Sequence, residues 1–149
     1  MRWLPRLCAR LPRAAWPAGG ATATIECLTP MWLKERGQDV RVPTIAVLVQ
    51  RIRDRLSMLC NFHEGKEWNA LFAEIRECAE KAENLKCEGE WVHSSRFSSR
   101  TDKAMPMGGF VGKVSCGGID PALWPLLRIG EEIHAGRFAV WGQGWYSIK

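Results

Sequence analysis

The pattern of hydrophobic and polar positions predicts β structure between residues 21 and 42. Over residues 21–28, threonines roughly alternate with Ile25 and Cys27, which is the period of a strand, and Thr29-Pro30 then ends it. Residues 31–42 predict a short hairpin with its turn at 35–39.

The period changes after Pro43 to three and four residues, which predicts an amphipathic helix of about 18 residues. Pro43 near the first turn and Gly65 past the end are typical start and stop signals. The apolar positions of this helix are Ile45, Leu48, Val49, Ile52, Leu56 and Leu59. A second helical pattern over 68–82 carries glutamates on its polar side, and we interpret them as a solvated face.

The period returns to two in residues 87–99 and 108–118, which predicts two strands. The stretch 100–107 between them is polar and contains a proline, so we expect a mobile loop that joins them into a hairpin. Asp120-Pro121 predicts the start of another helix, with Asp120 as N-cap. Residues 136–148 then predict a final strand interrupted by glycines.

The predicted order is strand, helix, helix, strand, strand, helix, strand. With the acidic second helix set aside as an insertion, this order is βαββαβ. It predicts an α+β, ferredoxin-like fold, in which an antiparallel sheet carries its helices on one face. Many functions share this fold, so it selects none by itself.

Length and composition narrow the class of protein. The 149 residues fit one domain with a sizeable core, and 46% hydrophobic with 25% charged residues argue against a disordered chain. No apolar run approaches the roughly 18 residues of a membrane-spanning helix. The six cysteines form no CxxC pair and no zinc-ligand cluster. We therefore expect reduced thiols in a cytoplasmic protein, with no membrane contact, metal or other cofactor.

The net charge of +5 is unevenly distributed. Residues 1–57 carry ten basic and four acidic side chains, 58–90 carry four and eight, and 91–149 carry seven and four. Basic surface on both sides of an acidic segment suits a polyanion such as nucleic acid. Residues 1–20 contain arginines and prolines but no acidic residue, which indicates a poorly ordered linker or the remnant of an upstream region. The predicted domain is then 21–149.

Glycines are concentrated near the end of the chain. Gly136, Gly142 and Gly144 have the spacing G-x5-G-x-G, where a helix ends and the last strand begins. Such a loop can direct successive backbone N–H groups toward a phosphate, and Arg137 adds a positive charge. A bent terminal strand with a glycine after the helix is the alternative interpretation.

The runs MGGFVGKVSCGG and DPALWPLLRIGEEIHAGRFAVWGQGWYSI resemble the C-terminal ferredoxin-like domain of the CRISPR-associated precursor-crRNA processing endoribonucleases, members of the RAMP superfamily. ECLTPMWLKERG and the helix ending in RIRDRLSMLC resemble the opening of that domain, so the resemblance covers roughly residues 21–149. The G-x5-G-x-G run corresponds to the glycine-rich loop of that family. In the family another glycine usually stands two residues before the one matched by Gly136, where this sequence has His134.

The resemblance implies a prokaryotic protein with two ferredoxin-like domains in tandem, which holds CRISPR repeat RNA along the cleft between them and cleaves it without metal. Such cleavage uses the 2′-OH as nucleophile, with a general base, a general acid and a cation near the phosphate. In that family the general acid or base commonly lies in the N-terminal domain. This chain has the length of the C-terminal domain only, so we expect that it does not cut RNA alone.

His93 and His134 are the candidate catalytic residues, and each has a structural alternative. His93 shares a strand face with Trp91 and Phe97, so it either packs there or stacks on a base. His134 precedes the glycine run and either reaches a phosphate or complements the end of a helix dipole. The candidate RNA-binding residues are Gly136, Arg137, Gly142, Gly144, Lys113, Arg96 and Arg100. Three aromatic residues either stack on bases or belong to the core: Trp141, Trp145 and Tyr146.

Three functions follow as hypotheses. The first is the RNA-binding domain of a CRISPR repeat-processing endoribonuclease, as a truncated chain or one half of a split protein. It predicts that bulky residues at Gly142 and Gly144 weaken RNA binding without unfolding the domain. The second is a non-catalytic, RAMP-like structural subunit, with an exposed apolar patch where an N-terminal RAMP domain on another chain, or a second copy, docks. The third is a ferredoxin-like domain that binds a small ligand.

Overall fold

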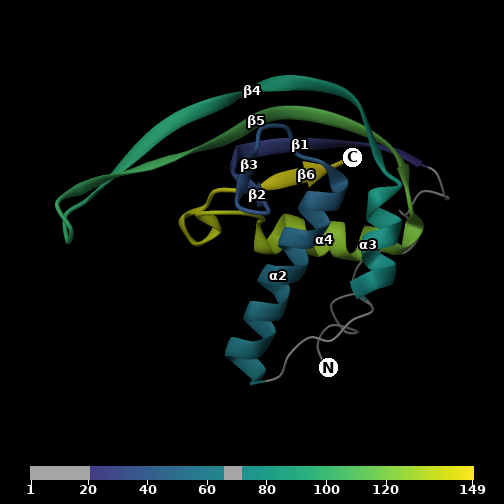
Figure 1. Cartoon of the computed structure of the whole chain (residues 1–149), viewed down its shortest axis with the longest axis horizontal. Coiled ribbons are helices and arrows are strands. Elements are labelled where there is room, and N and C mark those ends of the chain that lie inside the picture. Colours follow the sequence, from purple (N-terminus) through teal and green to yellow (C-terminus); the bar gives the residue numbers. More distant parts are fainter. Residues whose placement is uncertain (1–20, 66–71) are drawn as a thin grey trace.

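The computed structural model describes residues 21–65 and 72–149, so the predictions for 1–20 lie outside the described residues. The main sheet has four antiparallel strands in the order β4-β5-β1-β6 (Figure 1). Their bounds are β1 Ala21–Met31, β4 Glu83–Ser98, β5 Lys103–Ile119 and β6 Tyr146–Ile148. A small sheet pairs β2 Leu33–Glu35 with β3 Gln38–Val40.

The α-helices of the described residues lie on one face of the arched main sheet (Figure 1). They are α2 Ile45–Glu64, α3 Phe72–Glu80 and α4 Trp124–Ile133. Without α3 and the β2–β3 hairpin, the elements follow in the order βαββαβ, and the predicted ferredoxin-like fold with its helices on one face is confirmed.

The core lies between the sheet and the helices because the strands alternate as predicted. In β1, Ile25 and Cys27 are buried, whereas Glu26 between them faces the opposite side of the sheet. Buried residues of α2 and α4 meet this inner face, among them Ile52 and Leu127. Burial raises the pKa of the Cys27 thiol to about 12, so this cysteine acts as an inert apolar side chain.

Helix α2 ends at the predicted stop signal, Gly65, whereas its N-cap is Thr44. Thr44 is the N-cap, and its hydroxyl accepts a hydrogen bond of 3.3 Å from the backbone N–H of Val47. Pro43 precedes that cap. Gly65 ends the helix with φ of +65°, and its N–H donates to the carbonyl of Asn61 over 2.9 Å.

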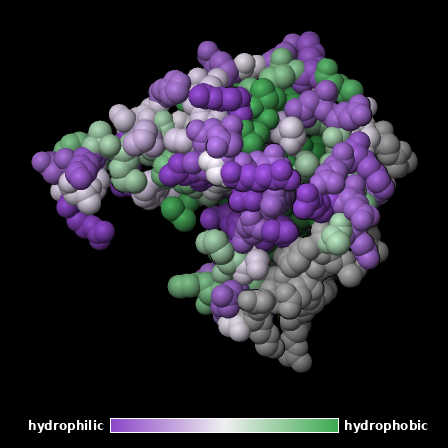
Figure 2. Space-filling view, viewed as in Figure 1, coloured by the Kyte–Doolittle hydropathy of each residue, from purple (hydrophilic) through white to green (hydrophobic). Residues whose placement is uncertain are grey.

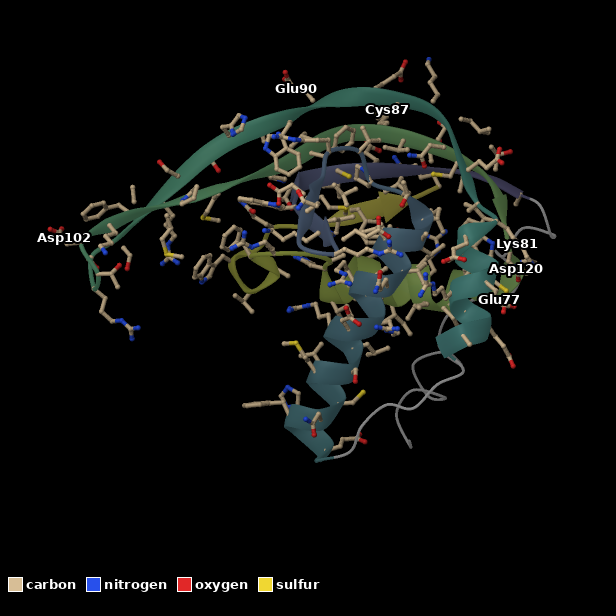
Figure 3. All side chains as sticks on the ribbon, viewed as in Figure 1. Glu77, Lys81, Cys87, Glu90, Asp102 and Asp120 are labelled. Carbon is tan, nitrogen blue, oxygen red and sulfur yellow. The ribbon has the colours of Figure 1, made fainter. Side chains whose placement is uncertain are left out.

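The start of the last helical segment is also confirmed. The Asp120 carboxylate accepts a hydrogen bond of 2.9 Å from the N–H of Ala122, and this bond lowers the pKa of Asp120. The capped turn is a 3-10 helix, η2 Pro121–Leu123, which leads into α4. Figure 3 shows Asp120 beside the end of α3, near Glu77 and Lys81.

Strand β6 is fixed to α4 by three hydrogen bonds. Glu131 accepts one of 2.7 Å from the N–H of Ile148, and Arg128 donates one of 2.9 Å to the carbonyl of the same residue. The buried Tyr146 hydroxyl donates to the carbonyl of Leu127. Arg128 also forms an ion pair with Glu131 at 3.0 Å, so its guanidinium stabilises the contact between α4 and β6.

The predicted mobile loop at 100–107 is wrong, because β5 begins at Lys103 and pairs with β4 from there on. The hairpin continues far beyond the main sheet, and Asp102 stands at its tip (Figure 3). Pro106 misled the prediction. Strand β1 pairs with β5 only as far as Phe110, so Pro106 lies where β5 has a single neighbour, and strands tolerate proline there.

The predicted final strand at 136–148 is largely wrong as well. Only Tyr146–Ile148 is a strand, and a 3-10 helix, η3 Ala139–Trp141, stands within the glycine run. The backbone has positive φ at Gly136, Phe138, Gly142 and Gly144. Such angles lie outside the β region, so they exclude a continuous strand. In the described part of the chain, no helix is long and apolar enough to cross a membrane.

A test of the core is Gly130→Ala in α4. A Cβ atom at Gly130 would collide with the Tyr146 hydroxyl and the side chain of Ile52. We expect the free energy of unfolding to fall by about 1–3 kcal/mol in a urea titration, as for other overpacked cores. Glu132→Ala, exposed on the same helix, is the matched control and should change it by less than about 0.5 kcal/mol. A Gly130→Ala protein as stable as the parent would contradict this packing.

Candidate nucleic-acid interface

Arginines and aromatic rings contact one another in one continuous cluster that includes residues of the β4–β5 hairpin. We call it the arginine–aromatic cluster, and it consists of Arg41, Trp91, Trp32, Arg137, Phe138, Trp141 and Arg96. It joins the β2–β3 hairpin, strand β4 and the glycine-rich loop at 134–145. Parts of the chain that are distant in sequence therefore share one surface.

Trp32 is the centre of the cluster. Its ring lies edge-on to Trp91 and to Phe138, with ring centroids 5.7 and 5.8 Å apart. Its indole N–H donates a hydrogen bond of 2.7 Å to the carboxylate of Asp39, which lowers the pKa of Asp39 and fixes the ring against the β2–β3 hairpin. The Arg137 guanidinium lies 4.6 Å from the centroid of Trp32.

The other cluster arginines also lie over rings. Arg41 stands 4.7 Å from the ring centroid of Trp91, and Arg96 stands 4.5 Å from that of Trp141. Trp141 in turn stacks on Phe138 at 5.3 Å. A guanidinium held over a ring keeps its full charge, because a ring does not neutralise it as a carboxylate does.

An open groove of about 360 Å³ runs beside the cluster, between the β2–β3 hairpin and the β4–β5 hairpin. Rings, hydroxyls, one guanidinium and one carboxylate line it: Trp32, Asp39, Arg41, Trp91, His93, Ser94 and Ser95 are among its residues. We call it the hairpin groove. His93 is exposed there, so the structure disfavours the packed alternative and leaves its ring accessible to a ligand.

The glycine-rich loop does not present its N–H groups as the sequence predicted. The N–H of Arg137 donates to the carbonyl of Trp32 at 2.9 Å, and that of Gly144 donates to Pro30 at 3.0 Å. The remaining N–H groups with intraprotein acceptors are those of Ala135, Trp141, Gly142, Gln143 and Trp145. The expectation of a row of N–H groups aimed at a phosphate is therefore wrong for these positions, because the protein itself satisfies them.

The three glycines of the loop differ in their surroundings. All three have positive φ, between +71° and +88°. A Cβ atom at Gly144 would collide with the backbone of Ala135, and one at Gly136 with the carbonyl of Trp32, whereas Gly142 faces open space. Gly136 and Gly144 are thus required for close backbone approach, and the expectation that a bulky residue at Gly144 leaves the fold intact is wrong.

His134 stands at a backbone position that favours glycine, with φ of +62°. This is the position at which the resembled family usually has glycine. Its ring stacks on the half-exposed Trp145, with centroids 6.0 Å apart and planes 5° apart. Its Nδ1 lies 3.3 Å from the carbonyl oxygen of Gln143. If Nδ1 carries the proton, Nε2 is free to act as an acceptor or base.

The remaining candidates lie apart from the cluster. Lys113 pairs with Glu26 at 3.3 Å on the sheet face opposite the helices, and Arg100 belongs to the turn at the hairpin tip. The alternative that the aromatic residues near the end of the chain belong to the core is right for the fully buried Tyr146. It is wrong for Trp141 and Trp145, which are about half exposed.

Sequence reasoning missed Trp32 and Arg41, which flank the β2–β3 hairpin. A signal for them existed. Because Leu33 pairs with Val40, the residues just outside that pair must also lie opposite each other. Phe138 was missed because residues 136–148 were interpreted as a strand.

The geometry does not assemble a complete acid–base site from the described residues. Neither His93 nor His134 has a side-chain hydrogen-bond partner that would serve as its acid or base. Among residues 21–65 and 72–149, no group of three or more metal-ligating side chains comes together. Rings and guanidinium groups, which the cluster does bring together, are side chains of the kind that contact bases and phosphates in RNA-binding proteins.

Comparison with known proteins yields one family model, "CRISPR-associated endoribonuclease Cas6", which matches residues 25–146. No curated protein matches the chain.

Several solved structures share the fold. A Cas6 product complex superposes with a TM-score of 0.66 at 17% identity, over 98% of this chain and 56% of that one. Thermus thermophilus Cas6 gives 0.66 at 16% identity, over 98% and 57%. A Cas6-RT-Cas1–Cas2 complex gives 0.63 at 17% identity, over 99% and 16%. This chain thus spans little more than half the length of the first two.

Two glycines of the loop provide a stability test. Gly144→Ala and Gly142→Ala both introduce a Cβ at positive φ, which costs about 1–2 kcal/mol. Only the former also collides with Ala135. We expect Gly144→Ala to be about 2 kcal/mol less stable than Gly142→Ala in denaturant unfolding. Equal stability of the two variants would refute the close approach at Gly144.

A second test uses the strained backbone of His134. His134→Gly and His134→Ala both remove the stack on Trp145, but only glycine accepts φ of +62° without a steric penalty. The glycine variant should therefore be about 1 kcal/mol more stable than the alanine variant. Thermal unfolding followed by circular dichroism measures the difference. An alanine variant as stable as the glycine variant would show that the position carries no strain.

Proposed function

Because this chain belongs to the CRISPR-associated endoribonuclease Cas6 family, we propose that it is the RNA-binding unit that holds CRISPR repeat RNA for processing. One observation carries the proposal. The arginine–aromatic cluster borders an open groove and keeps three guanidinium groups charged over rings. Unstacked bases and phosphates are the ligands that such a surface recognises.

The chemistry of the groove supports RNA over a closed small-molecule site. Its walls come from two hairpins and it is open to solvent, so a chain can pass through it. The Arg41 guanidinium that lies over the Trp91 ring offers a planar surface on which a base can stack, and the serines beside His93 offer hydroxyls to base edges or to the 2′-OH. A small-ligand pocket would bury most of its ligand.

In this proposal the chain binds RNA but cleaves it only together with a second ferredoxin-like domain. That domain, which lies outside residues 21–149, would supply the acid or base. His93 in the hairpin groove and the Nε2 atom of His134 are the groups of this chain that could contact the reacting phosphate.

A structural subunit without catalysis is the second candidate, and one observation favours it. Met58 and Phe62, near the end of α2, are 68% and 86% exposed. Exposed apolar side chains of this size suit a protein contact. The solution mass separates the candidates: a chain that is monomeric and binds repeat RNA needs no such contact.

The experiment is a titration of labelled CRISPR repeat RNA with purified chain in EDTA, read on native and denaturing gels. We expect salt-sensitive binding without cleavage. Trp91→Ala and Arg137→Ala should each weaken binding about tenfold, since each removes a ring or a guanidinium from the cluster. Arg76→Ala is the matched control, because Arg76 is an exposed arginine on α3 that pairs with Glu80.

Other outcomes decide against parts of the proposal. No binding by the parent chain at low salt would overturn RNA binding and favour the structural subunit. Metal-independent cleavage by the chain alone would overturn the requirement for a second domain. Equally weakened binding by Arg76→Ala and Arg137→Ala would show that general charge, and not the cluster, binds the RNA.

A further inference from the structure

A second open groove lies on the α2 side of the cluster. Its volume is about 350 Å³, and we call it the α2 groove. It is lined by Trp32, Lys34, Arg51, Asp54, Arg55, Met58, Gly136 and Arg137. Four of these side chains are cationic and one is a carboxylate. In the space-filling view, hydrophilic side chains gather over α2 below the arched hairpin (Figure 2).

The cations of the α2 groove are oriented by the protein and retain donor groups. Arg55 donates through Nε to the carbonyl of Ile133, which fixes its side chain and leaves its terminal nitrogens for another acceptor. Arg51 contacts Asp54 through Nη2 at 3.2 Å, while its Nε is buried without a partner. Lys34 lies 3.5 Å from Asp39.

Two of the four cations lie beside carboxylates, Lys34 beside Asp39 and Arg51 beside Asp54, while Asp54 also pairs with Arg53. Arg55, which donates to a backbone carbonyl, supplies unbalanced positive charge in the groove. Arg137 lies over the ring of Trp32 rather than beside an acid. The surplus positive charge matches a phosphodiester backbone, for which guanidinium groups offer paired donors.

The two grooves meet at Trp32. It lines both of them, and Arg137, which lines the α2 groove, lies over its ring. The α2 groove is rich in cations, whereas the hairpin groove offers the Arg41–Trp91 pair and the exposed ring of His93. One polymer that crosses Trp32 would thus present phosphates on one side and bases on the other.

We propose that one RNA strand crosses the Trp32–Arg137 pair, with its phosphates in the α2 groove and its next bases unstacked in the hairpin groove. The proposal rests on the RNA binding proposed above and specifies the form of the RNA: the segment bound here is single-stranded. A duplex keeps its bases paired and stacked, so it cannot place them against Trp91.

The salt dependence of RNA binding tests the two parts of the proposal separately, the phosphates in the α2 groove and the bases in the hairpin groove. For single strands, the slope of log affinity against log salt decreases by about 0.7 for each phosphate that the protein no longer neutralises. The double variant Lys34→Gln and Arg51→Gln should bind about tenfold more weakly, with a slope reduced by roughly 0.7–1.4. Trp91→Ala should also bind about tenfold more weakly but with the slope of the parent. Arg76→Gln is the control for a surface arginine elsewhere.

Competition with unlabelled RNA tests the strand form. A single-stranded repeat segment should displace labelled RNA at about a tenth of the concentration that the same segment needs as a duplex. Equal competition by the duplex would overturn the single-strand assignment.

The outcomes separate this inference from the proposed function. If the parent binds RNA and the Lys34→Gln and Arg51→Gln variant keeps its slope, the phosphate groove is refuted while RNA binding stands, and the surplus charge would then suit an acidic protein partner. If the parent binds no RNA, the proposed function fails first. Circular dichroism of the double variant must match the parent, and Lys34→Gln alone serves as the milder variant if it does not.

Discussion

The backbone hydrogen bonds between the glycine-rich loop and the β1–β2 segment are the constraint on which the interface depends. Arg137 and Gly144 donate to the carbonyls of Trp32 and Pro30, and Ala135 donates to Gly144 across the base of the loop. These bonds require backbones so close that Gly136 and Gly144 have no room for a Cβ atom. They place Arg137 over Trp32, and the cluster is built outward from that contact. The glycines therefore act through shape, and the side chains around them carry the chemistry.

The positively charged side chains of this domain fall into two groups: some pair with carboxylates, and others lie over aromatic rings. On the outer face of the sheet, Glu26 pairs with Lys113 and Lys149, and these two lysines lower the pKa of the carboxyl. Beneath the hairpin, Arg41, Arg96 and Arg137 lie over rings instead. Paired cations contribute little to an external field, whereas those over rings contribute fully. The two faces of the described domain thus differ in how their cations are held.

Local sequence signals predicted much of the fold, and long-range contacts explain what they missed. The caps at Asp120 and Gly65, the α2 periodicity and the β2–β3 hairpin all depend on neighbours within a few residues, and each was predictable. Pro106 and the 136–148 segment were misread because their conformation depends on residues distant in sequence. Strand β1 does not reach the part of β5 that contains Pro106, and the loop donates to the carbonyls of Pro30 and Trp32. The site followed the same rule. Arg96 and Arg137 were found from charge near the loop, but Trp32 comes to lie beneath Arg137 only through the tertiary fold.

The outer half of the β4–β5 hairpin has a thermodynamic consequence of its own. The two strands pair as far as Ser98 and Lys103, yet β1 supports β5 only from Phe110 onward. Beyond that point the ribbon has two strands and no hydrophobic layer of its own, and isolated two-stranded ribbons are marginally stable. Its amide protons should therefore exchange with solvent through local opening, whereas those of β1 should exchange only when the whole domain unfolds. This outer half, which forms one wall of the hairpin groove, is thus the part of the sheet with the smallest free energy of opening. A ligand bound in the groove would be detected first as slower amide exchange in this wall.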